Sequence, residues 1–107
     1  MRAMRLVVMF DLPTGSKKER KTYAEFRKFL ISDGYNMEQF SVYTRVSLGR
    51  DNMDAHIERL KANLPAAGRV TLICLTEKQY EDRTVLVCSS EYKPKTQDLG
   101  AQLTLLF

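Results

Sequence analysis

The chain has 107 residues and a mass of 12.4 kDa, a length that predicts a single domain. Hydrophobic residues make up 44% of it, which is enough to build a core, and the low numbers of glycine (5) and proline (3) exclude a collagen-like or disordered chain. The formal net charge of +4 is a mild excess that favours a polyanionic partner.

The first predicted element is a strand over residues 5–10. This run is apolar, rich in β-favouring residues and too short for a helix, a pattern typical of a strand buried on both faces. Asp11 ends the strand. Residues 12–15, which contain Pro13 and Gly15, have the composition of a loop.

An amphipathic helix is predicted from residue 17 to about residue 32. Ser16 and Glu19 fit the capping-box pattern at its start, and Gly34 stops it. Its apolar residues recur at intervals of three and four, as expected of a helix that packs one face on a core: Tyr23, Phe26 and Leu30.

Residues 37–48 are β-branched and aromatic, which predicts either one long or kinked strand or a tight hairpin that turns near residues 39–41. A second helix then begins with Asp51 or Asn52 as its cap and runs to about Leu64. Residues 65–68 terminate it. Its predicted apolar stripe consists of Met53, Ile57, Leu60 and Leu64.

The last third of the chain is predicted to return to strands. Residues 69–76 and 84–88 are short apolar runs, and the polar residues 77–83 between them could hold one helical turn. A loop is predicted over 91–100, followed by a strand over 101–107. An apolar strand near a terminus favours pairing with an exposed sheet edge, in its own chain or in a partner.

This order predicts an α+β fold, a ferredoxin-like βαββαβ plait with one or more additional C-terminal strands. One domain spans residues 1–107, with a core up to about residue 88 and an extension over 89–107. Cys74 and Cys88 lie in apolar runs and are interpreted as small core residues. No secretory leader or membrane-length apolar run is present, so we expect a cytoplasmic protein without a membrane partner.

The motifs of most enzyme classes are missing, including HExxH, glycine-rich phosphate loops and zinc quartets. No serine or cysteine lies at a spacing from His56 that would indicate a nucleophile and its base, so His56 is interpreted as a solvated or packing residue. Asp11 stands where α+β folds commonly place functional groups, and its carboxylate suits Mg²⁺ or Mn²⁺. It could equally accept backbone hydrogen bonds in the next turn. One aspartate per chain is too few carboxylates for metal-dependent phosphodiester hydrolysis, so a nuclease would require symmetry that brings two copies of Asp11 together.

The excess positive charge lies in the first half of the chain. Residues 16–28 hold six basic residues against two acids, which predicts a helical stripe that contacts phosphates without reading bases, although an ordinary solvated face is the alternative. The apolar strands 70–75 and 85–87 lack the aromatics of an RNA-recognition platform, so duplex backbone recognition fits better. The candidate nucleic-acid-binding residues are Lys17, Lys18, Arg20, Lys21, Arg27 and Lys28, with Arg45 and Arg50 as extensions of the surface.

Three sequence blocks carry a family likeness. Residues 10–14, 20–30 and 34–43 closely resemble the CRISPR-associated protein 2 family, and most of all the members that accompany type II systems. The resemblance covers residues 5 to about 88 in order and length. The most specific parts are Asp11 and the block Gln39-Phe40-Ser41-Val42-Tyr43.

The resemblance implies a ferredoxin-like homodimer in spacer acquisition. Such a dimer bridges two dimers of the integrase, CRISPR-associated protein 1, and binds the body of the captured double-stranded DNA. The resemblance also implies metal-dependent endonuclease activity, with Asp11 as the metal ligand across the dimer interface. The alternatives are an active Mg²⁺-dependent endonuclease on DNA or RNA, and a ribonuclease toxin resembling virulence-associated protein D.

Overall fold

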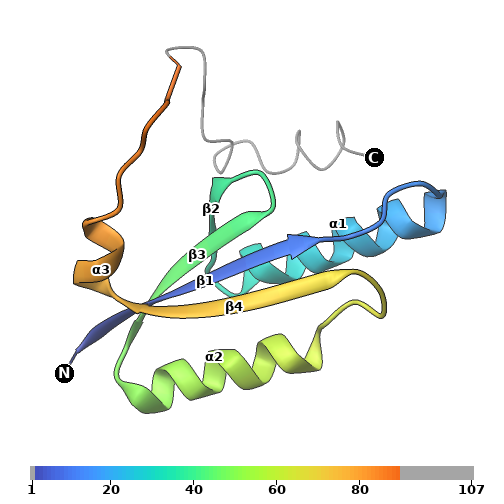
Figure 1. The fold of residues 1–107 in the computed structure, drawn as a ribbon. Helices are drawn as coiled ribbons and strands as arrows, with labels where there is room; N and C mark the ends of the chain where they lie inside the picture. Colours follow the sequence, from blue (N-terminus) through green and yellow to red (C-terminus); the bar gives the residue numbers. More distant parts are fainter. Residues whose placement is uncertain (1, 90–107) are drawn as a thin grey trace.

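The computed structural model describes residues 2–89, which form one four-stranded antiparallel sheet with the strand order β2-β3-β1-β4 (Figure 1). Two long helices pack on one face of the sheet and the chain order is βαββαβ, so the predicted ferredoxin-like α+β fold is confirmed. In chain order, the elements are β1 (Ala3–Asp11), α1 (Lys17–Ser32), β2 (Asn36–Gln39), β3 (Val42–Leu48), α2 (Arg50–Ala62), β4 (Arg69–Thr76) and the short α3 (Glu77–Glu81).

The central strand β1 divides its side chains between the two faces of the sheet. Leu6, Val8 and Phe10 point toward the helices and are buried, whereas Val7 and Met9 point to the other face and are only partly covered. The expectation that this strand is buried on both faces is therefore wrong. The reason is topological, because both long helices cover the same face. We call the other face the open face.

Helix α1 begins and ends where its sequence predicts. Ser16 Oγ accepts from the backbone N–H of Glu19 at 3.1 Å, and Glu19 Oε1 accepts from the backbone N–H of Ser16 at 2.9 Å. Gly34 follows the helix with a φ of +91°, which a side chain would disfavour. The predicted apolar side is confirmed, since the buried residues of α1 include Tyr23, Phe26 and Leu30.

The middle of the chain forms a hairpin, β2–β3, rather than one strand, and it turns at Phe40 and Ser41. Helix α2 begins one residue before the predicted caps, after Gly49, and ends at Ala62. Asn52 does not cap it, because its Oδ1 accepts from Ser47 Oγ at 2.7 Å. Within the predicted stripe Leu60 is buried and Met53 and Ile57 are partly buried, whereas Leu64 lies beyond the helix end and is exposed.

Strand β4 and the helical turn α3 form as predicted, but the strand predicted over residues 84–88 does not. Residues 83–89, which follow α3, pair with no strand of the described sheet and are irregular (Figure 1), although residues 84–87 line a pocket together with Val7 and Val42. The core assignment of Cys74 and Cys88 is also wrong. Both are exposed, because Cys74 lies on the edge strand β4 and Cys88 lies in the irregular segment.

The loop predicted over 91–100 and the strand predicted over 101–107 lie outside the described residues. The domain boundary near residue 88 stays a prediction. Within residues 2–89, no helix is long and apolar enough to cross a membrane.

Candidate functional site

Asp11 is the last residue of β1, and its side chain is exposed. Pro13 cannot donate a ladder hydrogen bond, so the strand ends here and the chain turns toward α1. In the register of β1 with β4, Asp11 lies opposite Arg69, the first residue of β4. Gly68, with a φ of +92°, packs so closely that an added Cβ would lie 2.6 Å from the backbone oxygen of Asp11. The α2–β4 turn thus holds the backbone at Asp11, from which the exposed carboxylate projects.

A pocket of about 360 Å³ opens beside this carboxylate. It is formed where the end of β1, the start of α1 and the β2–β3 turn meet, and we call it the Asp11 pocket. The lining residues combine one acid, one guanidinium, hydroxyl groups and aromatic rings: Asp11, Leu12, Thr14, Arg20, Tyr23, Phe40 and Ser41. This mixture of groups is suited to a polar ligand that also has an aromatic plane.

The predicted basic stripe is present on the first half of α1. Lys17, Lys18, Arg20 and Lys21 surround an open depression of about 600 Å³ together with Ala24. Within residues 2–89 none of the three lysines has an ion-pair partner, so these ammonium groups are available to a ligand. Lys28 is exposed further along the same helix. We call the depression between Lys17, Lys18, Arg20, Lys21 and Ala24 the lysine surface.

Arg20 connects the two hollows, because it lines both the Asp11 pocket and the lysine surface. Its Nη1 donates to the backbone oxygen of Thr14 at 3.2 Å, which orients the guanidinium toward the loop after β1. Asp11 and the predicted cations of α1 therefore form one continuous surface rather than two separate sites.

Three other predicted binding residues do not join this surface. Arg27 is 1% exposed; its Nη2 lies 3.8 Å from Met37 Sδ, and its guanidinium lies above the ring of Tyr43. Arg45 donates to the backbone oxygens of Asp33 and Val46. Arg50 is exposed, but α2 begins at the opposite end of the molecule from the start of α1 (Figure 1). Arg27 is thus a core residue, which corrects the prediction of a surface role.

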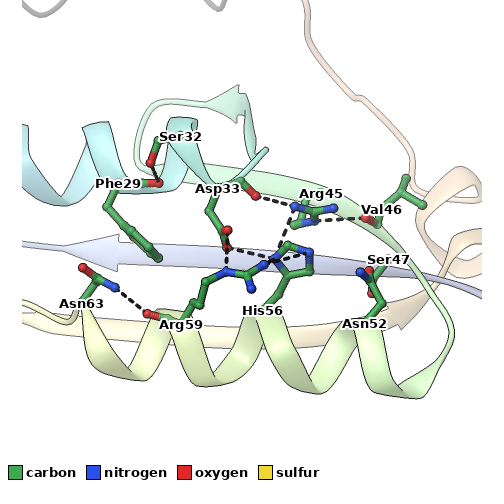
Figure 2. A network of polar contacts seen from close by, with 10 residues as sticks. All are labelled: Phe29, Ser32, Asp33, Arg45, Val46, Ser47, Asn52, His56, Arg59 and Asn63. Atoms are coloured by element: carbon green, nitrogen blue, oxygen red, sulfur yellow. Dashed lines mark hydrogen bonds and ion pairs between the residues drawn. The ribbon is translucent and has the colours of Figure 1, made fainter.

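His56 lies in a polar network between the end of α1, β3 and α2 (Figure 2). It is 5% exposed, so of the two sequence interpretations the packing role is confirmed and the solvated role is wrong. Its Nδ1 lies 2.9 Å from Asp33 Oδ2, and Arg59 Nε donates to Asp33 Oδ1 at 2.8 Å. Arg45 closes the network through the backbone oxygen of Asp33.

The network determines the ionisation of Asp33. Burial acts to raise its pKa, but the hydrogen bonds and positive charges of His56 and Arg59 outweigh burial and hold the pKa below the usual value of 3.8. Asp33 therefore carries a negative charge, and its hydrogen bonds with His56 and Arg59 hold α2 against the end of α1. The two serines in Figure 2 bond to other groups than His56: Ser32 Oγ donates to the backbone oxygen of Phe29, and Ser47 Oγ donates to Asn52 Oδ1.

The described residues contain no group of three or more metal-ligating side chains. At the Asp11 pocket one chain offers one carboxylate and the hydroxyl groups of Thr14 and Ser41. Mg²⁺ is usually held by one or two carboxylates together with substrate phosphates. A single chain therefore does not fit a resident cation, whereas two copies of Asp11, or one copy with a bound phosphate, would.

Sequence reasoning missed the β2–β3 turn as a part of the site. Phe40 and Ser41 line the Asp11 pocket although they lie almost thirty residues from Asp11 along the chain. The signal was available in part, because Phe40 is an aromatic residue at the predicted turn of a hairpin. Its place beside Asp11 depends on the pairing of β3 with β1, which the sequence pattern does not specify.

One protein family and three individual proteins with similar sequences carry related descriptions. Residues 4–83 match the family of the CRISPR associated protein Cas2. A CRISPR-associated endoribonuclease Cas2 of Acidovorax ebreus (strain TPSY) is 50% identical over 102 residues, which cover 95% of this chain and 99% of the relative. The protein of the same name from Streptococcus mutans serotype c (strain ATCC 700610 / UA159) is 51% identical over 77 residues, covering 72% and 71%.

A third relative of that name, from Parvibaculum lavamentivorans (strain DS-1 / DSM 13023 / NCIMB 13966), is 40% identical over 94 residues, covering 88% of this chain and 92% of the relative. The matched region contains Asp11, the lysine surface and the β2–β3 turn. These matches support the likeness carried by the three sequence blocks over the resemblance to toxins. The chain belongs to the CRISPR associated protein Cas2 family.

Proposed function

We propose that this protein is a CRISPR adaptation protein that acts as a homodimeric scaffold. It binds the body of a DNA duplex and bridges two dimers of the CRISPR-associated protein 1 integrase during spacer acquisition. Family membership supports the pathway. The observation that carries the duplex-binding role is the lysine surface on α1, where four cations surround one depression.

The lysine surface has the properties of a phosphate-binding surface. Its ammonium groups are exposed, have the same sign and lie at the start of a helix, where backbone N–H groups add to the positive potential. Ammonium groups attract phosphates irrespective of sequence. The duplex is therefore held by its backbone, as expected of a scaffold that accepts DNA of any sequence.

Charge reversal tests this interface. In the variant Lys17→Glu/Lys21→Glu we expect duplex affinity at low salt to fall by at least about tenfold, because two attractive contacts become repulsive. The matched control is Lys61→Glu/Lys78→Glu, which makes the same charge change at two other exposed lysines. Fluorescence anisotropy with a labelled blunt duplex measures both. Equal losses in the two variants would contradict the proposed interface.

The homodimer is supported by apolar side chains that one chain leaves in water. Leu86 and Val87 are 88% and 86% exposed, and Val46 and Ile73 on the open face are more than one-third exposed. Contiguous exposed apolar groups mark interaction surfaces. The edge strands β2 and β4 each have only one neighbour within residues 2–89, so a second copy finds both an apolar face and a strand edge.

The dimer is tested by placing a charge in the exposed segment. Leu86→Asp should convert a dimer into a monomer, because a carboxylate would be buried against the partner. Leu64→Asp is the control, since Leu64 is also an exposed leucine and lies just beyond the end of α2. Light scattering gives the mass directly. A monomeric wild type, or a dimer that survives Leu86→Asp unchanged, would rule out this interface.

The integrase is the proposed protein partner. When integrase and this protein are mixed with duplex DNA, we expect one complex that contains two copies of this chain and two integrase dimers. Its mass, measured by light scattering during gel filtration, identifies the composition. Integrase that elutes separately from this protein at every ratio would contradict the bridging role.

A second candidate function is a Mg²⁺- or Mn²⁺-dependent endonuclease. Two observations favour it: Asp11 is exposed beside a pocket that contains Arg20, and the relatives are named endoribonucleases. Two Asp11 carboxylates in a symmetric dimer would supply the second ligand that one chain lacks. The cation would activate a water molecule and neutralise charge on the phosphate, and Arg20 would orient that phosphate.

Asp11→Asn separates this activity from a contaminant. Cleavage of RNA and of DNA is followed with Mg²⁺, with Mn²⁺ and with a chelator, using wild type and variant purified side by side. Catalysis by Asp11 predicts cleavage by the wild type with metal and none by the variant. Equal cleavage by both proteins would assign the activity to a contaminating nuclease.

A further inference from the structure

Phe40 is the one exposed aromatic side chain within residues 2–89, at 62% exposure. The ring belongs to the turn between β2 and β3 and forms one wall of the Asp11 pocket. Neither duplex binding through lysines nor hydrolysis at Asp11 requires an aromatic ring here. A single exposed apolar side chain is common on protein surfaces, but this ring lines one pocket together with a carboxylate and a guanidinium, and that combination is what we explain.

The ring of Phe40 is held in place by its neighbours. Tyr23 stacks on one face of it, with ring centroids 6.2 Å apart and planes inclined by 22°. The Tyr23 hydroxyl lies 2.9 Å from Ser41 Oγ, and the Ser41 backbone oxygen accepts from the N–H of Phe10 at 3.1 Å. Ser41 has a φ of 63°, which is rare for a residue other than glycine. The turn therefore presents a fixed ring instead of a mobile one.

The lysine surface leads to this ring. Arg20 lines both hollows. A nucleic-acid strand whose phosphates lie along Lys17 and Lys21 therefore stays next to a positively charged side chain until it reaches the Asp11 pocket. The pocket has about 360 Å³, in the size range of small-molecule sites. It offers an aromatic plane, a guanidinium for a phosphate and oxygen atoms that accept from exocyclic amino groups. Together these groups match one nucleotide.

We propose that the Asp11 pocket binds one unpaired nucleotide of the nucleic acid held on the lysine surface, with the base stacked on Phe40. A base inside a duplex has both faces covered by its neighbours, so only an unpaired base, at a strand end or a frayed pair, can stack on the ring. The inference rests on the proposed function, because the same cations hold the adjoining phosphates. It adds a subsite that distinguishes strand ends from the duplex body.

A second protein chain is a less suitable occupant of this ring. Phe40 packs on Tyr23 of α1, which covers the face of the sheet opposite to the open face. The exposed residues proposed for the dimer, such as Leu86, follow α3, whose Tyr80 and Glu77 contact side chains of the open face such as Arg5. The neighbours of Phe40 in the pocket are charged and polar, which favours a charged ligand over an apolar protein surface.

The test compares a blunt duplex with the same duplex carrying a one-nucleotide overhang of 2-aminopurine, made once as DNA and once as RNA. Stacking of one base on an aromatic ring predicts that wild type binds the overhang duplex about 5-fold to 100-fold tighter than the blunt duplex. The emission of 2-aminopurine should change as the unpaired base moves from its stack on the terminal base pair to the ring of Phe40. The two arms identify which sugar the pocket accepts.

Each variant is compared with itself on the two duplexes. Phe40→Leu should lose the preference for the overhang, and Phe40→Tyr, which keeps the ring, should retain it. Far-ultraviolet circular dichroism and thermal unfolding confirm that both are folded. The proposal is overturned if wild type shows no preference, if Phe40→Leu keeps it, or if Phe40→Leu changes only the dimer mass. Failure to bind the blunt duplex at all would instead refute the lysine surface.

Discussion

Two groups of cations in the part of the chain that the structure describes have opposite surroundings. On the first half of α1, the ammonium groups of Lys17, Lys18 and Lys21 have no ion-pair partner within the described residues. A second group consists of arginines with internal contacts: Arg27 is buried in the core, and Arg59 holds Asp33. The first group remains available to a ligand, whereas the second stabilises the fold.

Net charge is therefore a poor guide to where a ligand binds. A guanidinium forms several directed hydrogen bonds at once and is suited to an internal network, whereas an ammonium on a flexible stem is a strongly hydrated point charge suited to the surface. Arg27 and Lys28 are neighbours in the sequence, yet the first is 1% exposed and the second is exposed. The following variants test this division, beginning with the largest effect.

Arg27→Ala should destabilise the protein most. Removal of this buried side chain leaves a cavity beside Met37 and Tyr43, which predicts a loss of about 2–5 kcal/mol in the free energy of unfolding. Lys28→Ala, one residue further on, should change it by less than about 0.5 kcal/mol. Urea unfolding of both variants measures the difference. Similar losses would mean that the two groups are not distinct.

Asp33→Asn should weaken the contacts that hold the second group of cations. It should also change how the free energy of unfolding depends on pH in the acid range. The variant removes charged hydrogen bonds to His56 and Arg59, at a cost of about 1–3 kcal/mol at neutral pH. The pKa of Asp33 is lowered in the folded protein, so its contribution is present above the unfolded pKa of about 3.9 and is lost as pH falls through the lower folded pKa.

Unfolding free energies between neutral pH and pH 3 should therefore fall less steeply in Asp33→Asn than in wild type. Asp54→Asn is the control, because Asp54 is exposed on α2 and its ion pair with Arg50 is long, with 3.9 Å between the nearest atoms. A wild-type profile and an Asp33→Asn profile that run parallel through the acid range would show that the network does not hold Asp33 ionised.

Neutralisation of the first group should change salt dependence more than stability. In Lys17→Gln/Lys21→Gln the slope of log affinity against log salt should become shallower by about 1.8, since each phosphate contact contributes about 0.9. Lys61→Gln/Lys78→Gln should keep the wild-type slope. Anisotropy titrations over a range of salt concentrations provide the slopes. An unchanged slope in the first variant would remove these lysines from the interface.

Local patterns predicted most of the fold. The capping box of Ser16 and Glu19 and the apolar spacing of α1 are signals carried by neighbouring residues, and the structure confirms both. The failures concern long-range partners. Residues 84–88 have the composition of a strand but pair with neither free edge of the described sheet, β2 or β4, and Cys74 is exposed because β4 is at the edge of the sheet.

The candidate site was predicted in part for the same reason. Asp11 and the lysines of α1 follow from positions in one strand and one helix, and the structure brings them together through Arg20. Phe40 joins them only through the pairing of β1 with β3. Arg27 has the charge of its neighbours, but it lies on the side of α1 that faces the core, which its residue type alone would not predict.

The central claim is that two copies of this chain present their lysine surfaces to one duplex. The most direct test is the mass of the protein–duplex complex, measured by light scattering at low salt with saturating protein on a blunt duplex. The account predicts two chains per duplex for wild type and a loss of this complex in Lys17→Glu/Lys21→Glu. One chain per duplex, or a complex that this variant forms equally well, would contradict it.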